Sequence, residues 1–340
     1  MKVSITGVGA ALPARVVTNE ELAPGLGVTT EWIEQRSGIR ERRYAAADES
    51  ASSLGATAAL EAIAHSGHQP KDIATVIVAT CTPDYVLPAT ASIVQDKIGA
   101  TNAAAFDLAA ACSGFVYSLS VAAALITGTN SGPVVIVGSD LLSRHIDPDD
   151  ALTAPLFGDA AAAVVVEADP SAEPLFVELG SDGSGLEQVL IPGGGSKLPE
   201  GGLPHDPSSL HLKMFGREVF RNAVRVMSEL GESYGKDAFD LMVAHQANKR
   251  ILDECAKQIG IGSDKVYMNI QRYGNTSAAS IPLAIWEAWK TGRLDAGDRL
   301  LMLAFGAGYT WGSAALRWTI PSPALARAAP GERKLAETPV

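Results

Sequence analysis

The chain repeats one order of predicted elements in its two halves. In the first half, the apolar run "IATVIVATCTP" is followed by a helical segment, by "AAFDLAAACSG", by a second helical segment and by "GPVVIVGSD". In the second half, "FDLMVAHQAN", "VYMNIQRYGNTS" and "GDRLLMLAFGAG" occupy the corresponding places. Strands that alternate with helices form sheets that helices bury. The repeat therefore predicts a duplicated α/β protein whose site lies at the junction of the halves.

Composition and charge exclude several classes of protein. The 340 residues are 47% hydrophobic, which is enough for a substantial core. The formal net charge of −11 argues against binding to nucleic acid or to anionic lipid. The uncharged run Leu108–Thr127 is rich in small residues, so we expect a buried helix and no membrane span. Three scattered cysteines fit no disulfide framework or zinc site, which favours a reducing cytoplasm.

The segment "AAACSGF" sets Cys112 among small residues at the start of a predicted helix. Taken alone, a cysteine in an apolar run is most often a packing residue of the core. A strand that ends near Leu108 and a helix that begins near Ser113 instead place the sulfur at a helix N-terminus, where partial positive charge stabilises a thiolate and lowers its pKa. Gly114 leaves room for a thioester to approach. On these residues alone, both interpretations stay open.

Two further polar residues follow predicted strands in the second half. His245 begins "HQAN", and Asn275 lies in "GNTS", almost opposite Cys112 in the repeat. Each alone fits a structural role, as a satisfied histidine or as a turn or cap. Such junctions gather at the carboxyl ends of parallel strands, so we predict that the three residues meet there. The glycine-rich "AFGAGYTWG" predicts that the N–H groups of Gly306 and Cys112 pair to bind an oxyanion.

Five motifs together resemble one known family. "EWIEQRSGIRER", "AAACSGF", "HQAN", "GNTSAAS" and "GAGYTWGSA" occur in this order. They resemble β-ketoacyl-acyl carrier protein synthase III, a family of the thiolase-like fold, from about Met1 to Trp318. The resemblance implies two duplicated halves in a five-layer αβαβα sandwich. Residues 1–170 form the half with the nucleophile, residues 171–320 form the half with His and Asn, and residues 321–340 are expected to be a disordered tail.

The resemblance implies a decarboxylating condensation. Cys112 takes an acyl group from coenzyme A or acyl carrier protein. His245 and Asn275 donate hydrogen bonds to the thioester carbonyl of malonyl-acyl carrier protein and stabilise the enolate formed as carbon dioxide departs. The carbanion attacks the acyl-cysteine and gives 3-ketoacyl-acyl carrier protein, in fatty-acid initiation or a dedicated polyketide pathway. The resemblance implies a homodimer and no metal or redox cofactor.

The resemblance also assigns residues to the substrate and to the carrier. Trp32 and Arg36 match residues that grip coenzyme A. Leu87 and Phe157 match residues of the acyl pocket, and Leu87 reaches that pocket from the partner subunit. The positions expected to face the acidic carrier are Arg250 and Lys249 after "HQAN" and a basic stripe on one predicted helix, Arg217, Arg221 and Arg225.

Three positions depart from the family pattern. Ala151 stands where an arginine contacts coenzyme A, and Arg217 stands where an asparagine does. Both changes weaken coenzyme A binding, so we predict a carrier-bound acyl donor. Leu87 replaces an aromatic residue of members that use short primers, which leaves room for longer or branched acyl groups.

Other functions of the same fold remain to be separated. An acyltransferase that passes the acyl group to an alcohol, an amine or a second ketide would keep Cys112 and change the acceptor. A non-catalytic partner subunit would lose the nucleophile, which this chain retains. A degradative thiolase would have a second cysteine near "AFGAGYTWG", and an elongating synthase would have a second histidine in place of Asn275; the sequence has neither.

Overall fold

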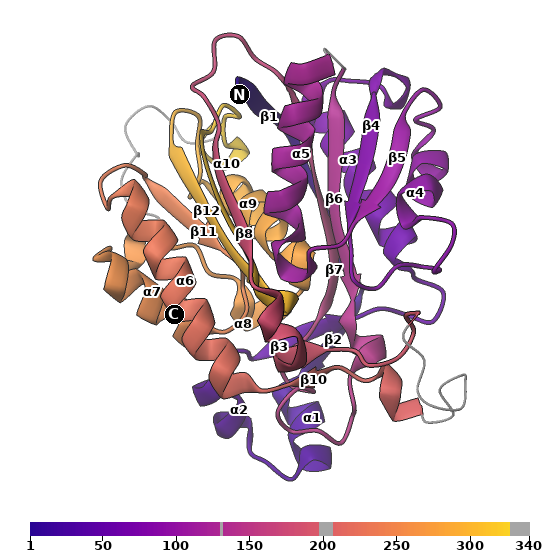
Figure 1. Ribbon diagram of the computed structural model, residues 1–340, viewed down its shortest axis with the longest axis vertical. Coiled ribbons are helices and arrows are strands. Elements are labelled where there is room, and N and C mark those ends of the chain that lie inside the picture. The colour runs from indigo at the N-terminus through magenta and orange to yellow at the C-terminus, as the bar shows by residue number, and fades with distance from the viewer. Residues whose placement is uncertain (130–131, 197–206, 327–340) are drawn as a thin grey trace.

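The structure, a computed structural model, describes residues 1–129, 132–196 and 207–326. Two sheets dominate these residues (Figure 1), with strand orders β1-β7-β6-β4-β5 and β11-β12-β13-β8. The strands are β1 (Val3–Ala11), β2 (Arg15–Thr18), β3 (Glu41–Tyr44), β4 (Thr75–Ala79), β5 (Ala104–Leu108), β6 (Val134–Leu141), β7 (Asp159–Ala168), β8 (Phe176–Ser181), β9 (Val189–Leu190), β10 (Lys213–Met214), β11 (Leu241–Ala244), β12 (Arg299–Gly306) and β13 (Thr310–Arg317). The helices are α1 (Asn19–Leu26), α2 (Thr30–Ser37), α3 (Ala51–Ser66), α4 (Thr90–Ile98), α5 (Gly114–Thr129), α6 (Gly216–Tyr234), α7 (Lys249–Ile259), α8 (Ile270–Tyr273), α9 (Ser280–Thr291) and α10 (Pro323–Ala326).

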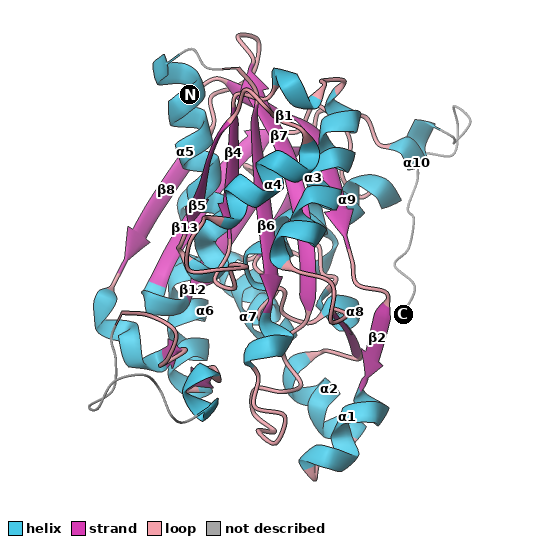
Figure 2. Cartoon of the chain, turned by 90° about the vertical axis from the view of Figure 1, so that its right-hand side faces the viewer, coloured by secondary structure: helices cyan, strands magenta, loops and turns pink. Residues whose placement is uncertain are grey.

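Helices and sheets alternate in five layers, which confirms the predicted αβαβα sandwich (Figures 1 and 2). Helices α3 and α4 pack on the outer face of the first sheet, and α6 and α7 pack on the outer face of the second. Helices α5 and α9 lie between the sheets and share one continuous core with both. This middle layer brings the two halves of the chain together.

The predicted buried helix is α5. By length and composition, the segment Ala111–Thr129 is the one stretch in the described part of the chain that could cross a membrane. In the fold it belongs to the middle layer, where Phe115, Val116 and Leu119 are fully buried against both sheets. A core position explains its apolar composition.

The strand pairs of the two halves match each other. Ile77 of β4 lies beside Ile136 of β6, and Val243 of β11 lies beside Met302 of β12; both pairs are parallel. All four side chains point into the shared middle core. One constant sequence offset relates both pairs, so the halves correspond residue by residue through the strands.

The same offset relates the turns that precede the two middle helices. The 3₁₀ turn η2 (Ala111–Ser113) opens at Ala111 with φ 47°, and η7 (Ser277–Ala279) opens at Ser277 with φ 51°. Cys112 therefore corresponds to Ala278. Asn275, predicted to lie almost opposite Cys112, lies three residues before the exact counterpart and corresponds to Ala109, because the backbone turn and not the polar residue defines the equivalence.

The first residues of the predicted disordered tail pack on the body of the protein. The hydroxyl of Ser322 donates to the carbonyl of Trp289 at 2.7 Å, and its backbone N–H donates to the carboxylate of Asp295 at 2.8 Å. The predicted start of the tail at residue 321 is therefore wrong. Residues 327–340 of that tail lie outside the described residues.

Candidate active site

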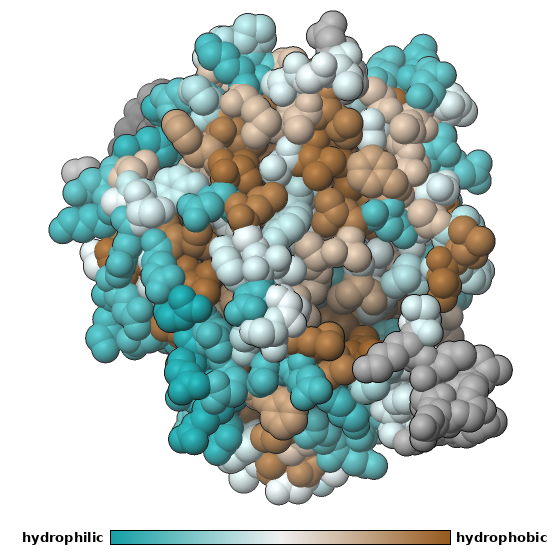
Figure 3. Space-filling view, viewed as in Figure 1, coloured by the Kyte–Doolittle hydropathy of each residue, from teal (hydrophilic) through white to brown (hydrophobic). Residues whose placement is uncertain are grey.

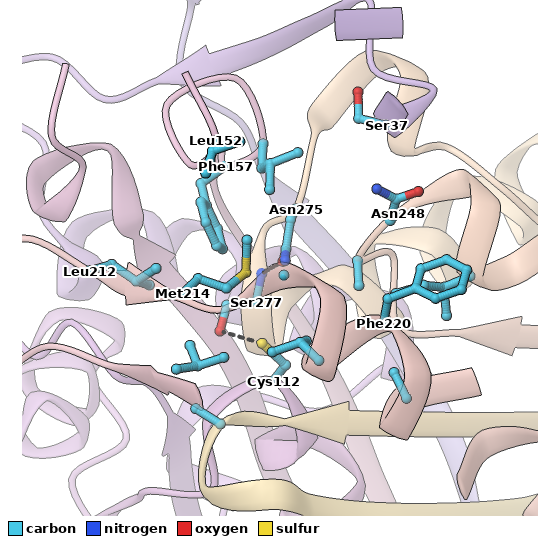
Figure 4. A pocket seen from close by; sticks show the side chains of 18 of the residues that line it. Ser37, Cys112, Leu152, Phe157, Leu212, Met214, Phe220, Asn248, Asn275 and Ser277 are labelled. Carbon is cyan, nitrogen blue, oxygen red and sulfur yellow. Dashed lines mark hydrogen bonds between the residues drawn. The ribbon is translucent and has the colours of Figure 1, made fainter. Parts of the chain in front are cut away.

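A cavity of about 840 Å³ lies where the two halves meet, and Cys112 lines it (Figure 4). Cys112 is the middle residue of η2, directly before α5. The hydroxyl of Ser113 donates to the carbonyl of Thr310, and the hydroxyl of Thr310 donates to the carbonyl of Ala110, both at 2.9 Å. The second half thus holds this turn in place. The predicted position of the sulfur at a helix N-terminus is confirmed.

The predicted low pKa of the Cys112 thiol is wrong for the free chain. Burial raises this pKa to about 12; the hydroxyl of Ser277, 3.6 Å from Sγ, lowers it, and the charge of Asp140 raises it. Loss of hydration outweighs the helix N-terminus because the cavity is walled mainly by apolar side chains. The thiol is therefore protonated at neutral pH, and it must lose its proton as it attacks.

His245 follows β11 and presents one ring nitrogen to the cavity. Its Nδ1 lies 2.6 Å from the hydroxyl of Ser280, and that hydroxyl oxygen accepts the backbone N–H of Gln246 at 3.4 Å. Burial lowers the pKa of His245 to about 3, so the imidazole is neutral. If the Ser280 hydroxyl donates to Nδ1, the ring proton lies on Nε2. In this tautomer His245 is a neutral hydrogen-bond donor.

Asn275 lies between α8 and η7 and also lines the cavity. Its Oδ1 accepts the backbone N–H of Ser277 at 2.9 Å (Figure 4), which leaves the amide NH₂ group for a ligand. Its backbone N–H donates to the carbonyl of Leu156 at 2.8 Å, and its carbonyl accepts the N–H of Gly158 at 3.0 Å. These backbone contacts to the first half fix the residue on both sides.

Gly306 ends β12 directly against the nucleophile turn. A Cβ atom at this position would lie 2.8 Å from the backbone nitrogen of Cys112 and 3.0 Å from that of Ser113. No side chain fits there without displacing the backbone. Gly306 and Cys112 both line the cavity, so their neighbourhood agrees with the predicted oxyanion site.

Four residues predicted to meet the substrate or the carrier lie around the cavity. The guanidinium of Arg36 lies 4.4 Å from the ring centroid of Trp32, a cation–π distance. Arg217 and Arg250 line the same cavity, and Arg250 lies 5.5 Å from the ring centroid of Phe220. Arg36, Arg217 and Arg250 have no carboxylate partner within the described ranges. They leave positive charge available beside the cavity.

The predicted basic stripe is more nearly neutral than expected. Arg221 pairs with Glu218, and Arg225 lies 3.2 Å from a carboxylate oxygen of Glu229. Lys249 likewise pairs with Asp253 at 2.7 Å and does not line the cavity. Surface pairs of this kind hold little energy, but they reduce the local positive field. The free charge is concentrated at Arg217 and Arg250.

The two predicted acyl-pocket residues lie in different places. Phe157 is buried, lines the cavity beside Asn275 and pairs with it in a short parallel bridge (Figure 4). Leu87 is 86% exposed and does not line the cavity of its own chain. Further apolar side chains near Phe157 complete the wall: Leu142, Leu156, Val189, Ile191, Leu212 and Met214.

Sequence analysis missed three polar residues that shape the site. Ser277 bonds to Asn275 and lies near Cys112, and Ser280 orients His245. Both occur in "GNTSAAS", where a serine before a helix is also typical of an N-cap and so gives no specific signal. Asp140 ends the apolar run "PVVIVGSD". A carboxylate at the end of a buried strand indicates a polar site, because a buried carboxylate needs several hydrogen-bond donors around it.

Comparison with known proteins decides the family. The sequence profile of 3-oxoacyl-[acyl-carrier-protein (ACP)] synthase III matches residues 106–183, and the profile of its C-terminal part matches residues 232–318. A beta-ketoacyl-[acyl-carrier-protein] synthase III of Chelativorans sp. (strain BNC1) is 43% identical over 327 residues, covering 93% of this chain and 99% of the relative. The chain belongs to the β-ketoacyl-acyl carrier protein synthase III family.

Solved structures of this family agree with the fold. The synthase III of Thermus thermophilus is 40% identical with a TM-score of 0.85, covering 93% of this chain and 99% of that one. The priming β-ketosynthase of the R1128 polyketide pathway is 34% identical with a TM-score of 0.86, covering 94% and 97%. The chain is therefore a condensing enzyme of the acyltransferase class with a thiolase-like fold.

Proposed function

We propose that this synthase transfers an acyl group to Cys112 and then joins it to the two-carbon unit of malonyl-acyl carrier protein. The observation that carries the proposal is one cavity lined by a thiol from the first half and by two neutral N–H donors, His245 and Asn275, from the second. Neutral donors suit a reaction in which negative charge develops on oxygen. The product is a 3-ketoacyl-acyl carrier protein.

Acylation forms a bond from Sγ of Cys112 to the donor's thioester carbon. The tetrahedral oxyanion receives hydrogen bonds from the backbone N–H groups of Cys112 and Gly306. The bond to the carrier sulfur then breaks, and the carrier leaves as a thiol that takes the proton lost by Cys112. Small residues around the nucleophile leave room for this intermediate, since a Cβ at Gly306 would contact the nitrogen of Cys112.

Condensation begins when the carbon–carbon bond to the malonyl carboxylate breaks and carbon dioxide leaves. The electron pair moves into an enolate, whose oxygen is stabilised by Nε2–H of His245 and the amide NH₂ of Asn275. The carbanion attacks the acyl carbon on Cys112, and the cysteine sulfur leaves as a thiolate that takes a proton from solvent water. These steps balance without an oxidant or a Lewis acid, so we expect no metal and no redox cofactor.

Intact-mass measurement of the purified protein tests the proposal. We expect an adduct of acyl mass after exposure to a panel of acyl thioesters, and a 3-ketoacyl product and carbon dioxide after addition of malonyl-acyl carrier protein. Cys112→Ala should lose the adduct and condensation, whereas Cys255→Ala, which alters a cysteine buried under α6, should keep both. An adduct on Cys112→Ala would refute the assignment. Transfer to an alcohol or amine without carbon dioxide would favour the acyltransferase alternative.

We propose that the acyl donor is a carrier-bound chain. Ala151 lines the cavity and carries no charge. Arg217 also lines the cavity, and it has no carboxylate partner among the described residues. Together with Arg36 and Arg250, Arg217 suits the single phosphate of a phosphopantetheine arm and the acidic surface of a carrier. Rates of Cys112 acylation by acyl-coenzyme A and by acyl-carrier donors decide this point. A strong preference for coenzyme A would overturn it.

We propose a homodimer as the working form. Strand β5 is an edge strand with an unpaired side, and Val86 and Leu87, on the loop before α4, are 91% and 86% exposed. Apolar surface also gathers over the face that carries α5 and β8 (Figure 3). If Leu87 enters the partner's cavity, Leu87→Trp should shift preference toward shorter acyl donors in the mass assay. Sedimentation as a monomer at assay concentration would contradict the proposal.

We also propose a cytoplasmic location for the enzyme. Its three cysteines, Cys81, Cys112 and Cys255, are all free thiols. Free thiols are maintained in a reducing compartment. Both fatty-acid initiation and a polyketide pathway are compatible with this location.

A further inference from the structure

The end of β6 carries a buried carboxylate that the reaction above does not use. Asp140 is fully buried, and no cationic side chain pairs with it among the described residues. Its Oδ1 accepts the backbone N–H of Cys81 at 2.8 Å and the hydroxyls of Thr80 and Thr82 at 3.1 and 3.2 Å. Its Oδ2 accepts the backbone N–H of Ala278 at 3.1 Å. One carboxylate therefore ties a loop of the first half to turn η7 of the second.

Turn η7 also controls the direction of a catalytic amide. Ser277, which precedes Ala278, has φ 51°, a conformation unfavourable for a residue with a side chain. Its backbone N–H donates to Oδ1 of Asn275 and so determines where the amide NH₂ group points. A force that holds Ala278 therefore also holds Ser277 and Asn275.

Asp140 occupies the position in the first half that Gly306 occupies in the second. The constant offset between the halves relates these two residues, just as it relates Ala278 to Cys112. Asp140 places its Oδ2 against the N–H of Ala278, whereas Gly306 has no side chain to place against the N–H of Cys112. In the proposed mechanism the N–H of Cys112 in η2 faces the oxyanion of the substrate. The equivalent N–H of Ala278 in η7 faces the carboxylate of Asp140 instead.

The counterpart of the active site is otherwise packed shut. A Cβ at Gly114 would lie 2.9 Å from the Cβ of Ala79 and 3.5 Å from that of Ala278. A Cβ at Gly138 would lie 2.4 Å from the carbonyl oxygen of Ala278. Main chains of β6 and η7 are in direct contact there, which leaves no room for a substrate. The carboxylate of Asp140 lies at this junction, bonded to the N–H of Ala278 on one side and to the hydroxyls of Thr80 and Thr82 on the other.

We propose that Asp140 is a positioning residue: its carboxylate occupies the pseudo-symmetric counterpart of the oxyanion site and thereby holds η7, and the amide of Asn275, in place beside Cys112. The inference rests on the proposed function, because it assigns Asp140 to the step that Asn275 serves. In the proposed mechanism, Asn275 acts in condensation and not in acylation of Cys112. Loss of the carboxylate should therefore impair condensation and spare acylation.

The first test is Asp140→Asn, assayed in two half-reactions. We expect acylation within about threefold of the parent and a loss of condensation of about 100-fold, because a small misplacement of a catalytic group has an effect of that order. Asp107→Asn is the matched control, since Asp107 is a strand-end carboxylate of the same half that accepts the N–H groups of Thr90 and Ala91. In this control the ratio of condensation to acylation should equal that of the parent.

The second readout is the rate of Cys112 alkylation by iodoacetamide as a function of pH. The titratable groups that face the thiol are Asp140 from β6, Cys81 after β4 and His245 after β11; the histidine is neutral, and burial keeps Cys81 protonated. Removing the charge of Asp140 should move the alkylation profile of Asp140→Asn to lower pH. This shift reports the charge of Asp140 at the thiol, whereas the ratio of condensation to acylation reports its positioning of Asn275.

Asp140→Glu covers the possibility that Asp140→Asn does not fold. It keeps the negative charge but changes the reach of the carboxylate, so the ratio of condensation to acylation should fall while the alkylation profile stays that of the parent. A parent-like ratio in either folded variant, or an equal fall in both half-reactions, would overturn the inference. No Cys112 adduct in the parent would instead overturn the proposed function.

Discussion

The two halves of this synthase share one backbone but divide its chemistry between them. At equivalent positions of the junction, one half carries a reactive or polar side chain and the other carries alanine or glycine. The four pairs, first half before second, are Ala79 and His245, Ala109 and Asn275, Cys112 and Ala278, and Asp140 and Gly306. Duplication supplied two similar frames, and the side chains leave only one of them open to substrate.

Packing distances explain how one site stays closed while the other forms a cavity. Around Ala278, glycines and alanines allow the main chains of β6 and η7 to touch. Around Cys112, Gly306 of β12 also lies close to the main chain, but the side chains of His245 and Asn275 border a cavity of about 840 Å³. The closed site is thus lined by small residues, and the open one also by larger polar side chains.

The largest expected effect comes from Gly306→Ala, which makes the open turn resemble the closed one. The added Cβ would lie 2.8 Å from the nitrogen of Cys112, so it displaces the oxyanion from its N–H donors. We expect acylation and condensation each to fall by about 100- to 1,000-fold, the usual effect of losing an oxyanion donor. Rapid-quench measurement of the Cys112 adduct gives both rates.

Gly128→Ala is the control for this substitution. A Cβ at Gly128, near the far end of α5, would meet no atom within 4 Å, so its rates should equal those of the parent. Parent-like acylation in Gly306→Ala would show that the N–H groups of Cys112 and Gly306 do not bind the oxyanion, and it would remove the chemical basis of the comparison between the two turns.

A second prediction uses pH, because His245 titrates and its counterpart Ala79 does not. Burial lowers the pKa of His245 from 6.5 to about 3, so between these values His245 binds a proton in the unfolded chain but not in the folded chain. The free energy of unfolding therefore decreases as pH falls, by about 2 to 3 kcal/mol between pH 7 and pH 4.5. Urea unfolding of the parent and His245→Gln at both pH values measures this difference. Equal pH dependence in the two proteins would refute the neutral, buried imidazole.

The smallest effect is expected from Ser280→Ala, which removes the hydroxyl that orients His245. Without it the imidazole can take either tautomer and lose its alignment, so condensation should fall by about tenfold while acylation changes little. Ser322→Ala removes a hydroxyl that donates to Trp289 at the other end of α9, and it should alter stability but not the ratio of the two rates. A parent-like ratio in Ser280→Ala would remove the serine from the site.

Patterns in the sequence predicted the layers and the meeting of the catalytic residues, because both follow from periodicity and from strand-end geometry. Cys112, His245, Asn275 and Gly306 all line the cavity as predicted. The pKa of the thiol could not be predicted, since it depends on burial by residues far apart in sequence. The ion pairs of Arg221 with Glu218 and of Arg225 with Glu229 could not be predicted either, because they depend on side-chain rotamers.

The correspondence between the halves was also only partly visible in the sequence. In the sequence, the polar motifs place Cys112 almost opposite Asn275. The positive φ angles of Ala111 and Ser277 show that Cys112 is equivalent to Ala278. Backbone conformation of this kind leaves no mark in the sequence when the residue is not glycine. The role of Asp140 depends on that equivalence and became apparent only from the structure.

The shared middle layer has a consequence for the independence of the halves. Helices α5 and α9 each contact side chains from both sheets within a single apolar cluster. A polypeptide cut between Ala168 and Phe176 would yield two fragments, in each of which one apolar helix, α5 or α9, is exposed to water. We expect such fragments to aggregate or to re-associate, so that neither half folds on its own.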